Sequence, residues 1–105
     1  MTVYVTAPID DAEAIAETLV DEQLAACVNR VECRSTYRWE GDVVEDDEVI
    51  LFVKTTAEAY DRLEARIEAL HPYEVPAIER FDADDVLEPF GRWIDESVRE
   101  PYRHD

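Results

Sequence analysis

The feature that most constrains the fold is a strict alternation of side-chain types over ten consecutive residues, Val31 to Glu40. Alternation with a period of two is typical of a β-strand with one buried face. The two faces carry Val31, Cys33, Ser35, Tyr37 and Trp39 on one side, and Glu32, Arg34, Thr36, Arg38 and Glu40 on the other. The chain is therefore predicted to contain a long, half-buried strand.

This strand is predicted to form the first arm of a β-hairpin. Glu40-Gly41-Asp42 supplies a turn, and an apolar run from Val49 to Val53 follows it. A continuous apolar run is expected of a strand that is covered on both faces. The inner end of the hairpin is therefore predicted to lie in the core.

The predicted hairpin is too long for a compact domain of this size. From Cys27 to Glu40 the first arm would reach ~48 Å at ~3.4 Å per residue. A domain of 105 residues has an expected diameter of only ~33 Å. The projecting part carries Tyr37 and Trp39, whose burial needs a surface to pack on. We expect the hairpin to pack on another copy of the chain, unless a bulge or bend folds it back.

The remaining segments alternate between short strands and amphipathic helices. Asp10 with Glu13, and Thr55 with Glu58, can cap the first two helices. The predicted elements are strands over Val3–Thr6 and Ala77–Phe81 and helices that end near Gln23, Leu70 and Val98. The order β-α-β-β-α-β plus α is typical of a ferredoxin-like α+β sandwich, with two helices on one face of an antiparallel sheet. We predict a single domain over residues 1–105.

Two prolines fix the backbone of the run from His71 to Pro76. His71, because it precedes a proline, is excluded from helical geometry, so the second helix must end at about Leu70. We predict an extended backbone at His71. Its ring either lines a cleft beside Tyr73 and Glu74 or caps the helix through a hydrogen bond to a free carbonyl.

The acidic composition limits the classes of partner. With 27 acidic and 10 basic residues the formal charge is −17, which disfavours nucleic acid and anionic membranes and favours divalent cations. Acids spread along a chain that keeps 47% hydrophobic residues are also typical of adaptation to a salt-rich cytosol. No apolar run approaches the ~20 residues of a membrane helix, and the N-terminus lacks a signal pattern. We therefore predict a cytoplasmic protein.

Five segments resemble the CutA family, the divalent-cation tolerance proteins. They are Leu24–Asn29, Ser35–Gly41, Lys54–Thr56, His71–Pro76 and Trp93–Ile94. The resemblance covers nearly the whole chain and implies a homotrimer in which each hairpin pairs with the sheet of a neighbour. Family members usually carry Pro-Gly where Glu32-Cys33 stands here, in a segment one residue longer, so a local bulge is expected to differ.

The family resemblance implies a divalent cation, copper among the candidates, and His71 with Glu74 is the candidate metal pair. One histidine and one carboxylate fall short of the three or four ligands of a specific transition-metal site. Some family members carry Cys at the position of Val5 and His at that of Leu70, and both ligand types are missing here. No resident cofactor is predicted.

Further residues are predicted to line a ligand cleft or an interface. The full set is Tyr37, Trp39, Lys54, His71, Tyr73, Glu74 and Trp93. Tyr37 and Trp39 suit interface anchors or a stacking platform for a ligand. Lys54, the only lysine, either meets an anionic ligand or lays its stem over the core. Tyr73 and Glu74 either line the cleft or brace the turn.

Signals for catalysis are weak. Cys27 and Cys33 form no CxxC pair and are predicted to stay reduced, and Cys27 has no base nearby in the sequence. With only Gly41 and Gly91, the chain has no glycine-rich phosphate loop. We predict that the protein is not an enzyme.

Three functions stay open. The first is a cytoplasmic trimer of the CutA type that responds to divalent metal ions by binding them. The second is a sensory trimer that binds a small anionic metabolite between subunits, by analogy of fold with signalling proteins of the PII type. The third is a purely structural, partner-binding trimer.

Overall fold

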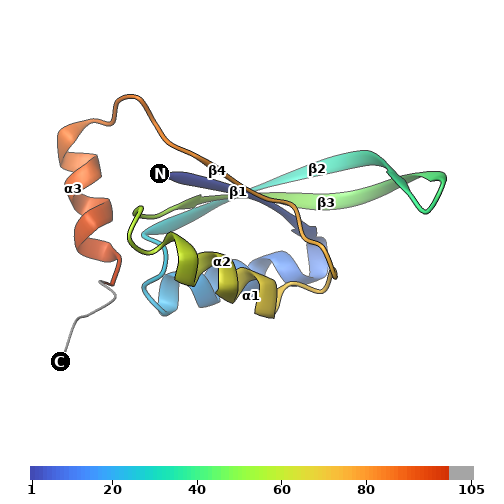
Figure 1. The fold of residues 1–105 in the computed structure, drawn as a ribbon, viewed down its shortest axis with the longest axis horizontal. Coiled ribbons are helices and arrows are strands. Elements are labelled where there is room, and N and C mark those ends of the chain that lie inside the picture. The colour runs from blue at the N-terminus through green and yellow to red at the C-terminus, as the bar shows by residue number, and fades with distance from the viewer. Residues whose placement is uncertain (100–105) are drawn as a thin grey trace.

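The computed structural model describes residues 1–99, which form four strands and three helices (Figure 1). All strand pairs are antiparallel, and the order across the sheet is β2-β3-β1-β4. The predicted order of elements and the α+β class are confirmed. The elements are β1 (Thr2–Pro8), α1 (Ile9–Asp21), β2 (Cys27–Trp39), β3 (Asp42–Lys54), α2 (Tyr60–Leu70), β4 (Ile78–Phe81) and α3 (Glu88–Ser97).

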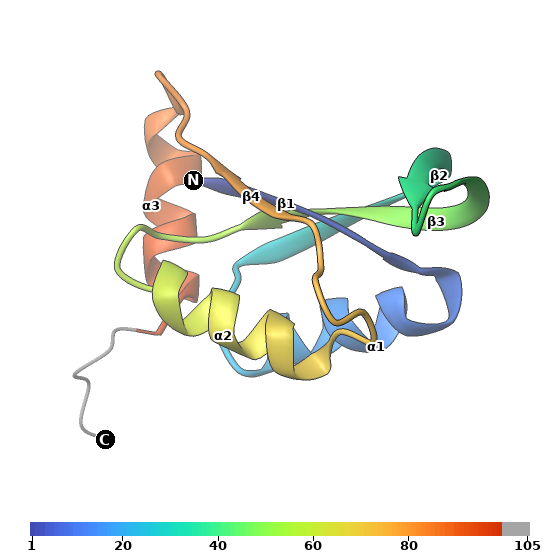
Figure 2. The same cartoon turned by 45° about the vertical axis from the view of Figure 1, so that its right-hand side comes forward.

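Helices α1 and α2 cover one face of the sheet, and the core lies between them and that face (Figures 1 and 2). The central strands contribute alternate residues to it, because successive side chains of a strand point to opposite faces. Val5 pairs with Leu51, and both are fully buried. The helices contribute Leu19, Leu63 and Ile67, also fully buried. This arrangement confirms the predicted ferredoxin-like sandwich.

The opposite face of the sheet carries no helix among the described residues, and we call it the open face. Its side chains alternate with those of the core, and many are apolar or aromatic. Tyr4 and Phe52 pair across it, with ring centroids 6.0 Å apart. Val31 of β2 is 47% exposed. A single chain therefore leaves apolar sheet surface uncovered.

The strands β2 and β3 form the predicted hairpin, which projects from the domain along its 47 Å axis (Figure 1). Their pairing is continuous from Cys27 opposite Lys54 to Trp39 opposite Asp42, so no bulge in this ladder folds the hairpin back. Residues Glu32 and Cys33 also pair regularly there. The tip turns through Glu40 and Gly41, both with positive φ, which suits the tight turns of hairpins.

Neither predicted helix cap forms, and for Thr55 a tertiary contact is the reason. Helix α1 begins one residue before Asp10, and within residues 1–99 no side chain caps it. Thr55 is 1% exposed, and its hydroxyl donates to the carbonyl of Leu24, 2.7 Å away, before α2 begins. Thr56 instead accepts a hydrogen bond from the Ala59 N–H at 3.3 Å.

Helix α3 stands at the end of the sheet opposite the hairpin tip (Figure 1). Its residue Ile94 packs with Val98, Ala26 and Ala59 in a second small core cluster. Phe90 and Trp93 of the same helix are 40% and 43% exposed. Among the helices of residues 1–99, none has the length and apolar character needed to cross a bilayer.

Candidate functional site

A polar cluster lies on the open face where the hairpin leaves the domain. Asp46 and Glu48 are two residues apart in β3, so they share the open face, opposite to buried Val49. Tyr37 of β2 donates its hydroxyl to Asp46. Tyr73, which follows α2, donates its hydroxyl to Glu48 at 3.1 Å. We call Tyr37, Asp46, Glu48 and Tyr73 the hairpin-root cluster.

The tyrosine hydroxyls hold the two carboxylates in place. Glu48 is only 5% exposed, and a buried carboxylate is costly unless it accepts hydrogen bonds. Burial, with the hydrogen bond to Glu48, raises the pKa of Tyr73 to about 12. The hydrogen bond to Asp46 is the main cause that raises the pKa of Tyr37. Both hydroxyls therefore remain protonated donors across the physiological range, and they orient carboxylate oxygens on the open face.

His71 lies behind this cluster and positions Tyr73. Its Nε2 lies 2.7 Å from the Thr6 carbonyl and its Nδ1 lies 3.1 Å from the Tyr73 backbone nitrogen. Since the Tyr73 N–H donates to Nδ1, the ring is the neutral tautomer that donates from Nε2. The backbone of His71 is extended, with φ −78° and ψ 136°, as predicted. The alternative that the ring caps α2 is wrong, because the accepting carbonyl belongs to β1; the backbone N–H of His71 binds the Ile67 carbonyl instead.

The proposed metal pair of His71 and Glu74 is not assembled within one chain. Both ring nitrogens of His71 already make hydrogen bonds, and His71 is 7% exposed, whereas Glu74 is exposed. No group of three His, Cys, Asp or Glu residues suited to a metal ion occurs in residues 1–99. Metal binding through this ring would require the loss of one of its hydrogen bonds.

The other predicted site residues lie apart from the cluster. Lys54 ends β3 six positions from Glu48, which is ~20 Å along a strand, and its Nζ donates to the Thr2 hydroxyl at 2.8 Å. Trp39 lies at the hairpin tip and Trp93 on α3. The structure thus brings Tyr37 and Tyr73 together but not Lys54, Trp39 or Trp93.

Asp46 and Glu48 were missed by the sequence reasoning. They belong to an acidic run that resembles a solvated turn when it is read along the chain. The signal that could have found them is the hairpin register, which places them on the same face as Tyr37. The contribution of Tyr73 needs the fold, because 25 residues separate it from Glu48.

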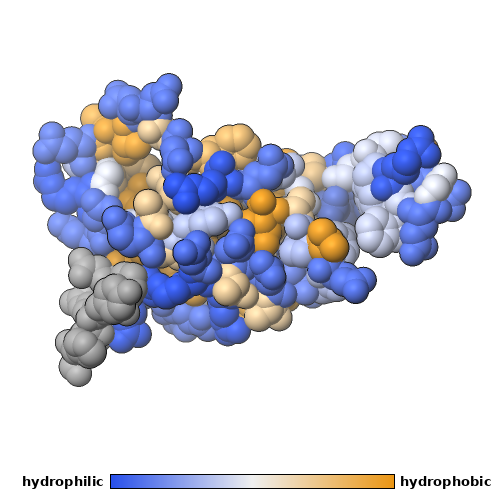
Figure 3. Space-filling view, in the orientation of Figure 1, coloured by the Kyte–Doolittle hydropathy of each residue, from blue (hydrophilic) through white to orange (hydrophobic). Residues whose placement is uncertain are grey.

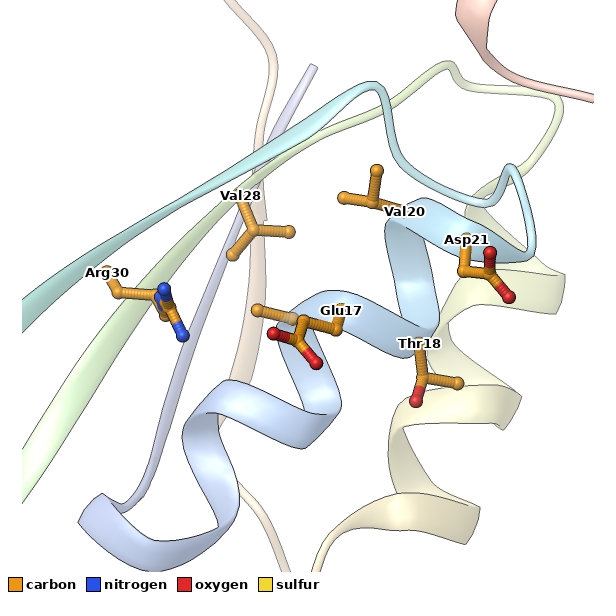
Figure 4. Close-up of a pocket in the computed structure, with 7 residues that line it drawn as sticks. Glu17, Thr18, Val20, Asp21, Val28 and Arg30 are labelled. Atoms are coloured by element: carbon orange, nitrogen blue, oxygen red, sulfur yellow. The ribbon is translucent and has the colours of Figure 1, made fainter.

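An open groove of about 660 Å³ lies between α1 and the outer strand β2 (Figure 4). Val28 and Arg30 come from β2, and the remaining lining residues come from α1: Ala16, Glu17, Thr18, Val20 and Asp21. Its charged side chains are exposed. The groove contains none of the predicted site residues, and it offers no buried polar group that would orient a ligand.

Alkaline pH should destabilise the protein through Tyr73. The unfolded chain loses this proton near pH 10 and the folded chain near pH 12, so this contribution to stability is present below pH 10 and is lost as pH rises through about 12. Tyr37 and Tyr60, whose pKa values are also raised, act in the same direction. The melting temperature should therefore fall less steeply with rising pH for Tyr73→Phe than for the wild type. Equal slopes would show that the Tyr73–Glu48 contact contributes nothing.

Comparison with known proteins places these features in a family. The family model described as CutA1 divalent ion tolerance protein matches residues 1–97. The divalent-cation tolerance protein CutA of Pyrococcus horikoshii is 45% identical over 98 residues, which cover 92% of this chain and 96% of that protein. The protein of the same name from Thermus thermophilus is also 45% identical, covering 91% and 95%.

Solved structures show the same fold. The crystal structure of CutA1 from Pyrococcus horikoshii superimposes with a TM-score of 0.91 at 43% identity, covering 94% of this chain and 98% of that one. The structure of the PII-like protein CutA from Nostoc, in apo form, superimposes with a TM-score of 0.92 at 32% identity, covering 94% and 97%.

Proposed function

The chain belongs to the CutA1 divalent ion tolerance family, and we propose that it acts as a homotrimer that binds a divalent cation rather than as a catalyst. The observation that carries the proposal is the pair of carboxylates, Asp46 and Glu48, on one face of the hairpin root. Carboxylate oxygens are ligands that hard divalent cations prefer. The hydroxyls of Tyr37 and Tyr73 hold these carboxylates in fixed orientations, which lowers the entropy cost of binding.

The proposed cation site needs ligands beyond these two carboxylates. Two carboxylates supply fewer than the about six oxygen ligands that magnesium or calcium takes. Water or a second copy would provide the rest. The homotrimer is supported by the uncovered open face and by the hairpin that projects beyond its own domain. Assembly through these surfaces would place the hairpin root of one copy next to another copy.

Titration calorimetry of Asp46→Asn in molar potassium chloride tests the proposed site. Asn keeps an oxygen that can accept from Tyr37 but removes the charge, so we expect Mn²⁺ affinity to fall at least about tenfold. The matched control is Asp47→Asn, the same substitution one residue along, on the opposite face, where Asp47 accepts a bond from Arg34 at 2.8 Å. The control should bind as the wild type does.

Two outcomes of the titration would contradict the proposed site. Equal losses in both variants would mean that Mn²⁺ responds only to net charge. If copper binding is retained in Asp46→Asn but lost in His71→Ala, the site lies at the imidazole ring, as the family resemblance first suggested.

A sensory role is the second candidate, and the similarity to the PII-like protein of Nostoc favours it. In this alternative the ligand is a small anionic metabolite, and Lys54, at the other end of the open face, would supply the positive charge. Titration of nucleotides into the wild type and Lys54→Gln would detect it. Heat changes with nucleotides but not with Mn²⁺ would favour this role over cation binding.

A further inference from the structure

The groove between α1 and β2 lies on the face of the sheet that carries the helices. Arg30 pairs with Leu51 across the β2–β3 ladder, so both side chains point to this face. Leu51 is fully buried, whereas Arg30, on an edge strand of the sheet, is exposed. The groove is therefore separate from the open face, through which we propose that copies assemble.

Opposite charges face each other across this groove. The guanidinium of Arg30, from β2, and the carboxylate of Glu17, from α1, point toward one another in Figure 4. Within residues 1–99 neither side chain has a hydrogen-bond or ion-pair partner, whereas every other arginine there has a polar or electrostatic contact. Because no ion pair joins Arg30 to Glu17, both charged groups remain available to a ligand that lies between them.

Apolar side chains line the groove beside these charges. Ala16 is 5% exposed, and Val28 packs against the core. Val20 follows Ala16 by one helical turn, is 41% exposed and adds methyl groups to the same wall. On the face of the molecule shown in Figure 3, hydrophilic residues dominate and apolar residues form separate patches. The groove differs from such patches because charges of opposite sign flank its apolar lining.

Both walls of the groove are anchored in the fold. Helix α1 is held by Ile15 and Leu19, which are 2% and 0% exposed, and β2 is held by its continuous pairing with β3. A site that is formed before the ligand arrives costs little ordering entropy on binding. Its volume of about 660 Å³ lies within the range of ~300–1,000 Å³ that is typical of small-molecule sites.

We propose that this groove binds a free α-amino acid with a large apolar side chain. The carboxylate of the ligand pairs with Arg30, whose guanidinium presents two parallel N–H donors to a carboxylate. The ammonium of the ligand pairs with Glu17, and Asp21, one helical turn further, adds negative potential. The apolar side chain lies on Val20 and Val28. Neither charged group is buried in the free chain, but the ligand covers both, and exclusion of water strengthens the two ion pairs.

Titration of ¹⁵N-labelled protein with L-leucine in molar potassium chloride tests the site. Leucine should shift the backbone amide resonances of α1 and β2 that surround the groove. Leucinamide lacks the carboxylate and N-acetyl-leucine lacks the ammonium, so each should bind at least about tenfold more weakly than leucine. Glycine keeps both charges but has no side chain to cover the apolar lining, and it should also bind at least about tenfold more weakly.

Variants of the two charged residues identify which end of the ligand each one binds. Arg30→Gln should weaken leucine binding about tenfold but leave leucinamide binding unchanged, because leucinamide has no carboxylate for Arg30 to hold. Glu17→Gln should weaken leucine binding similarly and leave N-acetyl-leucine binding unchanged. The matched controls are Arg38→Gln, on the same face of β2, and Glu13→Gln, one turn before Glu17 on α1. Neither control residue lines the groove, so both variants should bind leucine as the wild type does.

Three outcomes would overturn the amino-acid site. They are no shift of the groove amides with leucine, equal binding of glycine and leucine, and equal losses in the groove variants and their controls. The groove shares no residue with the hairpin-root cluster, so Arg30→Gln should bind Mn²⁺ as the wild type does. Failure of the amino-acid site therefore leaves the proposed cation site intact, and the reverse also holds.

Discussion

Replacing Leu51 with alanine is expected to lower the free energy of unfolding by about 3 kcal/mol. Leu51 is fully buried in the middle of the sheet, where it pairs with Val5 and faces the layer of α1 and α2. The substitution removes buried apolar surface and leaves a cavity, because the central strands cannot move together without breaking their pairing. Thermal unfolding should occur on the order of 10–20 °C lower.

The measurement requires a fixed protein and salt concentration, because unfolding that is coupled to dissociation depends on both. Val75→Ala serves as the control, since its side chain is exposed and its truncation should change the free energy of unfolding by less than about 0.5 kcal/mol. A loss at Leu51 no larger than that at Val75 would contradict the assignment of β3 to the core.

Lowering the salt concentration is expected to destabilise the proposed homotrimer strongly. Each chain carries a formal charge of −17, so three copies would carry three times that, or −51. In molar salt the Debye length is ~3 Å and this repulsion is screened, whereas in ~0.01 M salt it extends to ~30 Å. The melting temperature should therefore rise steadily with potassium chloride, and the assembly should loosen in dilute buffer.

The matched control for the salt series is the same series near pH 4.2, the isoelectric point of the sequence. There the net charge approaches zero, so added salt should change the melting temperature much less. An equal gain at both pH values would show that salt acts through hydrophobic burial, and adaptation to a salt-rich cytosol would lose its support. The cytoplasmic location itself stays a prediction.

The hairpin and the first two helices could be predicted because their signals are local. Alternation from Val31 to Glu40 reports a strand directly, since neighbouring side chains of a strand point to opposite faces. The end of α2 at Leu70 follows from the proline two residues later, which acts through the backbone alone. In both cases the responsible residues lie within a few positions of the structure that they determine.

The candidate site could be predicted only in part, because its contacts join distant segments. Tyr37 was recognised as part of a ligand cleft or interface, but its partner Asp46 was not. The sequence indicates a cleft or turn role for Tyr73, but it does not identify Glu48 of the hairpin as the acceptor of its hydroxyl. The sequence offers two roles for the His71 ring, in a cleft or as a cap of α2, and it does not reveal that Nε2 lies 2.7 Å from the carbonyl of Thr6, which is 65 residues away.

The order of the elements, the length of the hairpin and the extended backbone at His71 follow from short stretches of the chain, because periodicity, turn chemistry and proline sterics act locally. Which polar side chains meet depends on how distant segments pack together. In the folded protein, the buried hydroxyl of Thr55 donates to the Leu24 carbonyl instead of capping α2. Both ring nitrogens of His71 form hydrogen bonds with backbone groups. Buried polar groups must find partners wherever the packed layers leave them, and that need is set by the whole fold.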